Sequence, residues 1–170
     1  YLNDKVYWGI KTGLNEAFII DHKTREKLIS EDSKSAEVIK SFLPGRDIKR
    51  YIPPTSDKYV IVIPKGWTRE RSEGASEAFD WLKENYPAIA NHLAPFADKA
   101  QKRSDQGEYW WELRACDYYD EFEKSKIIFP DISLKGAFTL DEIGGIYSSN
   151  TTYIIGSSDK YLLGILNSVL

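Results

Sequence analysis

Four short apolar runs decide the fold of the second half of the chain: YWWEL (109–113), KIIFP (126–130), GAFTL (136–140) and NTTYIIG (150–156). They are rich in aromatic or β-branched residues, a composition typical of strands. We expect them to form short, largely antiparallel strands. The run that follows, YLLGILNSVL (161–170), is apolar on much of a helical surface and predicts a terminal helix.

The segment upstream of these strands is predicted to be mainly helical. Between about residues 72 and 104, apolar side chains recur at helical spacing, and Pro87 can open a new helix. Nearer the N-terminus we expect strands over 17–20, 47–52 and 58–63, a helix over 24–30 and another from Ser33 to Pro44. The pattern predicts an α+β (mixed α/β) fold, with one domain over 1–170 and a helical insertion at about 72–104.

The composition excludes several classes of protein. The longest apolar stretches are too short to span a bilayer, so no membrane partner is expected. The single cysteine, Cys116, excludes an internal disulfide and a multi-thiolate zinc site, which fits a cytoplasmic location. The chain starts at Tyr1 and contains no methionine, so we expect a fragment truncated at both ends.

Charge is segregated along the chain. The formal net charge of −3 argues mildly against nucleic-acid binding, but it is the distribution that matters. Cations cluster in RDIKR (46–50), around Lys65, Arg69 and Arg71, and at 99–103, whereas acids concentrate in DYYDEFE (117–123). This separation permits a basic face on a slightly acidic domain.

No catalytic or metal site is predicted. The one Pro-Pro pair, in YIPPTS, lacks the preceding amide and the following aromatic residue of an amino-methyltransferase loop, and glycine-rich phosphate loops are absent. His22 and His92 match no metal-ligand spacing. Pro130-Asp131 resembles the start of a PD-(D/E)xK nuclease motif, but no acid two residues before a lysine follows, so a turn after a strand is the better interpretation.

Six segments, in order, resemble the TaqI-like C-terminal specificity domain of type IIG restriction enzymes and related adenine-specific methyltransferases. These segments are GIKTGLNEAFIID (9–21), SAEVIKSFLPGRDIKRY (35–51), YWWELR (109–114), KIIFPDIS (126–133), NTTYIIG (150–156) and YLLGILNS (161–168). Residues 65–107 resemble the family least.

The resemblance implies a module that recognises double-stranded DNA of a specific sequence for a restriction-modification enzyme. In such an enzyme an adenine methyltransferase domain would lie upstream in the same chain and flip out the target base. No cofactor is expected in this fragment. The resemblance implies S-adenosylmethionine for the parent enzyme, with Mg²⁺ as a further candidate, and it leaves open whether the parent also cleaves DNA.

The loop GIKTGLN (9–15) is the first candidate DNA contact. Its two glycines remove side-chain bulk, while Lys11, Thr12 and Asn15 offer a phosphate contact and hydrogen-bonding groups, including an amide that can pair with adenine. An ordinary β-turn with solvated polar groups is the alternative. The family resemblance includes this loop and favours the DNA contact.

The segment GRDIKRY (45–51) is the second candidate. As a strand it would place Arg46, Ile48 and Arg50 on one face. A structural salt bridge from Arg46 to an acid is a serious alternative, because a buried arginine requires a paired acid. Lys49 and Arg50 are the better phosphate ligands, and phosphate contacts set affinity and register.

The remaining candidates lie at strand ends. In a strand, the tryptophans of YWWELR would point to opposite sides, so at least one is core; we assign Trp110 and Arg114 to the DNA face. Polar side chains before the NTTYIIG strand complete the set of predicted contacts: Asn150, Thr151 and Thr152. Two other classes stay open, a carbohydrate- or small-ligand-binding domain that uses exposed aromatics, and a protein-docking domain that uses the apolar terminal helix.

Overall fold

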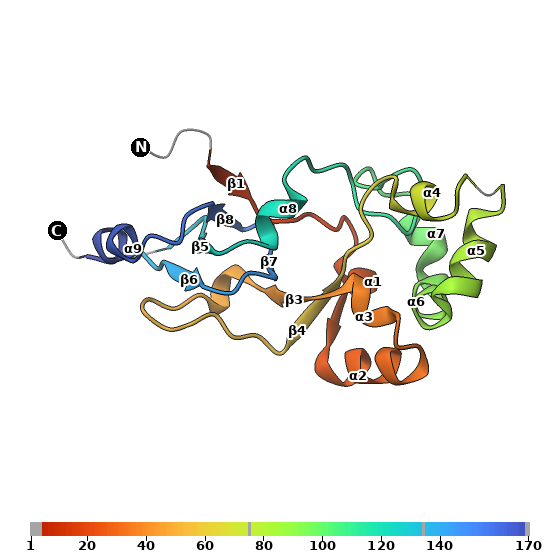
Figure 1. Ribbon diagram of the computed structural model, residues 1–170, viewed down its shortest axis with the longest axis horizontal. Coiled ribbons are helices and arrows are strands. Elements are labelled where there is room, and N and C mark those ends of the chain that lie inside the picture. The colour runs from red at the N-terminus through yellow and green to blue at the C-terminus, as the bar shows by residue number, and fades with distance from the viewer. Residues whose placement is uncertain (1–4, 75, 134, 169–170) are drawn as a thin grey trace. The chain divides into compact units, whose positions relative to one another are not determined.

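The computed structural model describes residues 5–74, 76–133 and 135–168. Its described residues divide into two compact units, which we call the sheet unit (within 1–10, 41–57 and 117–170) and the helical unit (within 11–40 and 58–116). Figure 1 labels the elements of both units. The predicted α+β class with largely antiparallel strands is confirmed.

The sheet unit is built on an antiparallel sheet in which the strand order is β1-β8-β5-β6. These strands are β1 (Val6–Trp8), β5 (Lys126–Pro130), β6 (Thr139–Asp141) and β8 (Thr152–Ile155). Ile127, Ile128 and Ile154 of the two central strands are fully buried, as expected for β-branched residues in the middle of a sheet. The strands predicted in KIIFP and NTTYIIG are confirmed, whereas of GAFTL only Thr139 and Leu140 lie in a strand.

The remaining elements of the sheet unit flank this sheet. Residues 41–43 of β3 (Ile39–Leu43) pair in parallel with β7 (Ile146–Ser148). Two short helices, η1 (Gly45–Asp47) and α8 (Tyr119–Phe122), lie in this unit, and η1 packs against β5. The predicted terminal helix is confirmed as α9 (Lys160–Asn167), where the Asp159 carboxylate accepts hydrogen bonds from the backbone N–H groups of Tyr161 and Leu162.

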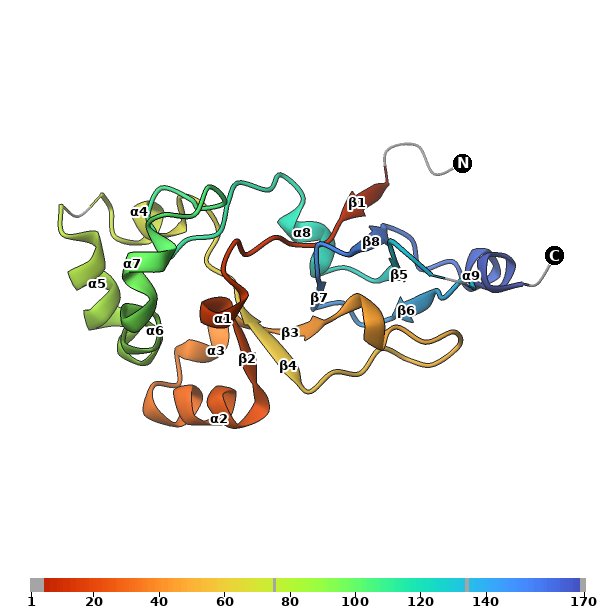
Figure 2. The same cartoon turned by 180° about the vertical axis from the view of Figure 1, so that it is seen from behind.

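The helical unit packs helices around an antiparallel pair, β2 (Ile19–Asp21) and β4 (Lys58–Ile61). Its longest helix, α2 (His22–Glu31), is capped by Asp21, which accepts from the Thr24 N–H, and packs against β4 and α6. The other helices are α1 (Asn15–Phe18), α3 (Ser35–Val38), α4 (Trp67–Arg71), α5 (Ala78–Asn85), α6 (Pro87–Leu93), η2 (Ala94–Phe96) and α7 (Ala97–Ala100). Helices α5 and α6 lie side by side in both views (Figures 1 and 2), and Pro87 opens α6 as predicted.

Four sequence-based predictions of secondary structure are wrong in whole or in part. In the strand expected over 17–20, Ala17 and Phe18 belong to α1 instead, and only Ile19 and Ile20 lie in β2. The helix expected from Ser33 to Pro44 is only the short α3, which ends at Val38, and β3 begins at Ile39. Residues 47–52 form no strand, because η1 is followed by a turn in which Tyr51 takes a left-handed conformation with φ of 59°. YWWEL is a turn closed by the Glu112 N–H donating to the Tyr109 carbonyl, and of this run only Leu113 joins a bridge, with Gln106.

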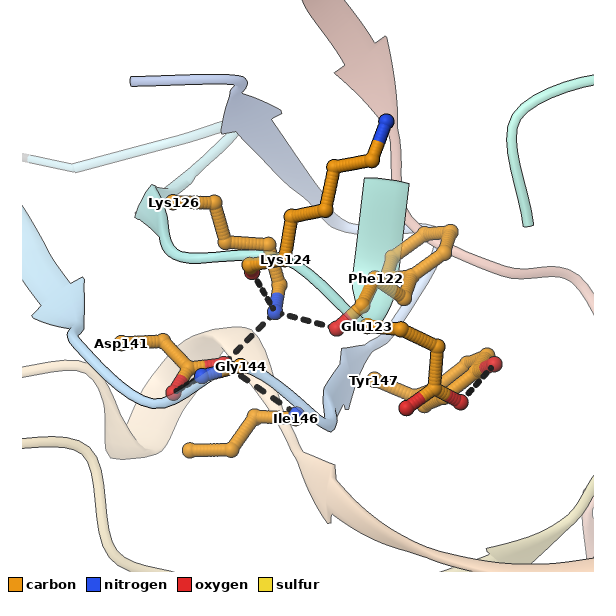
Figure 3. Close-up of polar contacts among 8 residues, drawn as sticks. All are labelled: Phe122, Glu123, Lys124, Lys126, Asp141, Gly144, Ile146 and Tyr147. Atoms are coloured by element: carbon orange, nitrogen blue, oxygen red, sulfur yellow. Dashed lines mark hydrogen bonds and ion pairs between the residues drawn. The ribbon is translucent and has the colours of Figure 1, made fainter. Parts of the chain in front are cut away.

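A buried ion pair ties together the end of α8, β5 and the turn after β6 (Figure 3). Lys126 Nζ lies 2.6 Å from Asp141 Oδ2 and also donates to the carbonyls of Phe122 and Lys124. Asp141 in turn accepts from the N–H groups of Gly144 and Ile146. Both partners are buried, and burial lowers the pKa of Lys126 although Asp141 opposes that shift. Every member of this cluster is satisfied, so the cluster fixes the β6–β7 turn.

We expect the helical unit to lose stability in mild acid because of His92 on α6. Burial holds the pKa of His92 below its usual range, and its hydrogen bond to the Ala17 carbonyl only partly opposes that shift. In the unfolded chain His92 takes up a proton at a pH of about 6.5, whereas in the folded protein it does so only at a lower pH. The free energy of unfolding therefore falls as the pH drops from about 6.5 towards the pKa of His92 in the folded state.

The urea midpoint, measured at pH values of about 7.5 and about 5, checks this expectation. His92→Gln is the control, because its amide can still donate to the Ala17 carbonyl but takes up no proton. An equal pH dependence in the wild type and in His92→Gln would contradict the assignment to His92.

Candidate nucleic-acid interface

The segment 46–50 of the sheet unit presents cations that no nearby acid holds tightly. The Arg46 side chain is 78% exposed, and its ion-pair contact is with its own neighbour Asp47, at 3.9 Å. Lys49 is exposed and forms no ion pair among the described residues. Arg50 is half-buried and donates from Nε to the Gly136 carbonyl, 3.1 Å away. The alternative in which Arg46 forms a structural salt bridge is therefore not what the structure shows.

Gly45 allows η1 to lie directly on the turn between β7 and β8. A Cβ atom at Gly45 would stand 3.0 Å from Thr151 Oγ1 and 3.1 Å from the Thr151 carbonyl oxygen, so a larger residue would push the two segments apart. Asn150 and Thr151 are exposed at this turn, whereas Thr152 is fully buried. The Thr152 hydroxyl donates to the Ser149 carbonyl and closes the turn. The fold thus brings Arg46 and Thr151 to the same hollow, leaves Asn150 exposed at the same turn as Thr151, and places Thr152 in the interior.

An open hollow of about 390 Å³ lies between η1 and the loop that follows β5. Arg46, Asp131, Ser133 and Thr151 give it polar walls, and Ile48, Pro130 and Ile132 give it apolar ones. A concave surface with one arginine, one acid and two hydroxyls can take both a phosphate and a base edge.

In the helical unit, Lys11 forms an ion pair, although the sequence predicts that its charge is available for a phosphate. Lys11 Nζ lies 2.9 Å from Asp105 Oδ2, and Arg114 Nη1 lies 3.8 Å from Asp105 Oδ1. The two cations share this acid, so Asp105 offsets part of their charge. Each must release part of this contact to bind a phosphate.

The polar residues of the same loop differ in exposure. Thr12 is buried and its hydroxyl donates to Asn15 Oδ1 over 2.6 Å, while Asn15 itself is exposed. Gly13 between them has a φ of 69°, a left-handed conformation that favours glycine. Thr12 therefore orients the Asn15 side chain and is itself too buried to contact a ligand.

Arg103, which the sequence suggested only as part of a basic cluster, is the anchor of this loop. Its buried guanidinium donates to the carbonyls of Thr12, Trp110 and Glu112 and lies 4.4 Å from the centre of the Phe18 ring. The planar fork thus joins the loop 11–15 to the turn 109–113. Nothing in the sequence distinguishes Arg103 from the other cations of its helical segment, so its anchoring role could not be predicted.

Arg103→Lys is expected to lower the free energy of unfolding of the helical unit by about 1–3 kcal/mol, because an ammonium group cannot reach all three carbonyls and leaves at least one unsatisfied. Chemical denaturation measures the change. Lys102→Arg, at an exposed neighbour, is the control and should be neutral. A loss for Arg103→Lys no larger than that of the control would contradict the anchoring role.

At least one tryptophan of the turn 109–113 belongs to the core, as predicted, although the strand expected there is a turn. Trp111 is buried, stacks on Tyr109 at 4.7 Å between ring centres and donates from Nε1 to the Thr68 hydroxyl. Trp110 is half-buried and packs on Phe79 at 5.2 Å. The buried Glu112 carboxylate accepts from the N–H groups of Gly66, Thr68 and Glu108, which holds the turn in place.

In the other basic clusters of the helical unit, three cations form ion pairs with acids. Arg69 contacts Glu108 at 3.2 Å, Arg71 contacts Glu37 at 3.0 Å, and Lys99 contacts Glu16 at 2.8 Å. Segment 46–50 of the sheet unit is therefore the predicted basic cluster that keeps the most charge available for a polyanion.

Neither a metal centre nor a membrane span is evident in the described part of the chain. Among the described residues, no three His, Cys, Asp or Glu side chains are grouped to hold a metal ion. No described helix has the length and apolar character needed to cross a bilayer.

Comparison with known proteins identifies the family. The pattern of the TaqI-like C-terminal specificity domain matches residues 40–170. Among solved structures, the type IIL restriction-modification enzyme MmeI, determined in complex with DNA, matches with a TM-score of 0.54 and 14% identity over 96% of this chain and 20% of that one. This chain thus spans about a fifth of MmeI, and at this identity the likeness is one of fold. No curated protein matches. The chain belongs to the family of TaqI-like C-terminal specificity domains.

Proposed function

We propose that this chain recognises a specific sequence in double-stranded DNA and positions it for an adenine methyltransferase domain upstream in the same protein. One observation carries the proposal: in a member of a specificity-domain family, the exposed Arg46 of segment 46–50 lines the same hollow as the exposed Thr151 of the polar turn before β8. Cations that meet phosphates set the register, and polar groups beside them are then placed at base edges.

The residues take different roles in this proposal. Arg46, Lys49 and Arg50 neutralise phosphates, and the hydroxyl and amide groups of Thr151 and Asn150 meet base edges. Burial removes Thr12 and Thr152 from the set of direct contacts and leaves them as supports for their neighbours.

The helical unit supplies a second, weaker set of contacts. Lys11 and Arg114 bind phosphate only after exchanging their shared partner Asp105, and Asn15 must exchange its hydrogen bond from Thr12 to pair with adenine in a bidentate manner. The half-buried Trp110 is the aromatic side chain assigned to stacking on a base.

The proposal extends to the parent enzyme as a cytoplasmic restriction-modification protein. Its methyltransferase domain would use S-adenosylmethionine, and Mg²⁺ would be required if the parent also cleaves DNA. The described residues of this chain then serve binding and positioning rather than chemistry.

Selection from a pool of random duplexes tests the proposal. The intact protein is incubated with the pool, bound DNA is recovered and amplified over several rounds, and the product is sequenced. We expect one defined motif that contains an adenine, and methylation of that adenine when S-adenosylmethionine is added. Recovery of a pool as random as the starting one would contradict sequence-specific recognition.

A further inference from the structure

Two isoleucines of the sheet unit stand almost fully in water. Ile132, in the loop after β5, is 91% exposed, and Ile143, in the turn after β6, is 94% exposed. An isolated exposed isoleucine is unremarkable by itself. The two differ in what surrounds them, and the surroundings indicate a role for Ile132.

The loop that carries Ile132 is tied to both segments that we assign to DNA. At its start, the Asp131 N–H donates to the Thr151 carbonyl at 2.9 Å. Towards its end, the Gly136 carbonyl accepts from Arg50 Nε at 3.1 Å, and the Ser133 hydroxyl donates to the Lys135 carbonyl within the loop. Ile132 is thus held at the rim of the hollow that Arg46 and Thr151 also line.

Charge separates the two isoleucines. Ile132 lies in a loop with exposed Lys135 and borders Arg46. Ile143 directly follows Asp141 and Glu142, whose charges are balanced by ion pairs with Lys126 and Lys160. Around Ile132, by contrast, the cations Arg46, Arg50 and Lys135 outnumber the acids Asp47 and Asp131. A polyanion is therefore drawn more strongly to the loop of Ile132 than to that of Ile143.

We propose that Ile132 is an apolar wedge that inserts between two base pairs of bound DNA and kinks the duplex beside the recognised bases. The proposal rests on the proposed function, since it requires DNA on this face. An isoleucine in water gains from burial in a base stack, and the cations on the same loop and on segment 46–50 hold the backbone on either side of the opened step. Kinking then adds specificity through the deformability of the step rather than through hydrogen bonds.

The test compares DNA affinity and DNA bending in the intact protein. The probe is a duplex of about three helical turns, with central TA steps because these unstack readily, and with a donor and an acceptor dye at its two ends. Anisotropy measures affinity, and energy transfer between the dyes measures the kink, which for inserted apolar wedges is about 20–90°. The variants are Ile132→Ala, Ile132→Leu and, as the matched control, Ile143→Ala.

We expect Ile132→Ala to weaken binding roughly tenfold and to abolish most of the change in energy transfer, because the buried methylene groups are lost. Ile132→Leu should retain both signals, and Ile143→Ala should match the wild type. Since Ile132 contributes almost nothing to the core, the urea midpoint of all three variants should stay at the wild-type value.

The outcomes separate this inference from the proposed function. If the wild type binds the duplex but Ile132→Ala and Ile143→Ala bind and bend it equally, the wedge is overturned and the proposed function stands. If the wild type binds no duplex at low salt, both are overturned.

Discussion

Replacing Lys126 by methionine is expected to lower the free energy of unfolding of the sheet unit by about 3–5 kcal/mol, because the substitution leaves the buried Asp141 carboxylate without its partner. Two backbone carbonyls, those of Phe122 and Lys124, lose a donor at the same time. Loss of this size is a large share of the stability of a typical domain. Urea denaturation, followed by far-UV circular dichroism, measures it.

Lys160→Met is the matched control for this prediction. It removes the same charge from the same unit, but the ion pair of Lys160 with Glu142 is exposed, and such pairs contribute about 0–1 kcal/mol. Equal losses for Lys126→Met and Lys160→Met would contradict the role of the buried pair. Because Asp141 also holds the N–H groups of Gly144 and Ile146, replacing both partners with apolar residues should not restore full stability.

The second large effect is on DNA affinity. The triple variant Arg46→Gln, Lys49→Gln, Arg50→Gln is expected to bind mixed-sequence duplex DNA about 100-fold more weakly at physiological salt and to reduce the log–log salt slope by about 2.7, since each phosphate contact contributes about 0.9. Fluorescence anisotropy over a salt series gives both values. The free energy of unfolding should change little, because the three side chains lie outside the hydrophobic core and the variant gives up one exposed hydrogen bond, from Arg50 to the Gly136 carbonyl.

A control with the same change in net charge separates local contacts from long-range attraction. Lys99, Lys124 and Lys160 are exposed, and each forms an ion pair with an acid. The triple glutamine variant at these positions should keep a salt slope close to that of the wild type. An equal reduction in both triple variants would show that net charge, rather than segment 46–50, governs binding.

The local sequence pattern correctly predicted those elements whose conformation depends on their own residues. KIIFP and NTTYIIG are strands because β-branched residues fill the centre of a sheet, and α9 follows from apolar residues at helical spacing after the Asp159 cap. Pattern failed where distant groups decide. The turn 109–113 looks like a strand, but the Glu112 side chain binds the N–H groups of Gly66 and Thr68, far away in the sequence.

The candidate site shows the same division. Exposure of Arg46 and Lys49 matches the composition of their segment, although the strand predicted there is a short helix and a turn. Neutralisation of Lys11 was invisible in the sequence, because Asp105 comes close only in the folded helical unit. The burial of Thr12, Thr152 and Arg103 likewise depends on tertiary packing, which residue type and spacing do not reveal.

Binding of duplex DNA by the intact protein, measured by fluorescence anisotropy from low to physiological salt, tests the central claim most directly. The account predicts binding that weakens steeply with salt, with a log–log slope of several units, at about 0.9 per neutralised phosphate. Absence of binding at low salt, or an affinity that does not change with salt, would contradict the assignment of this chain to DNA recognition.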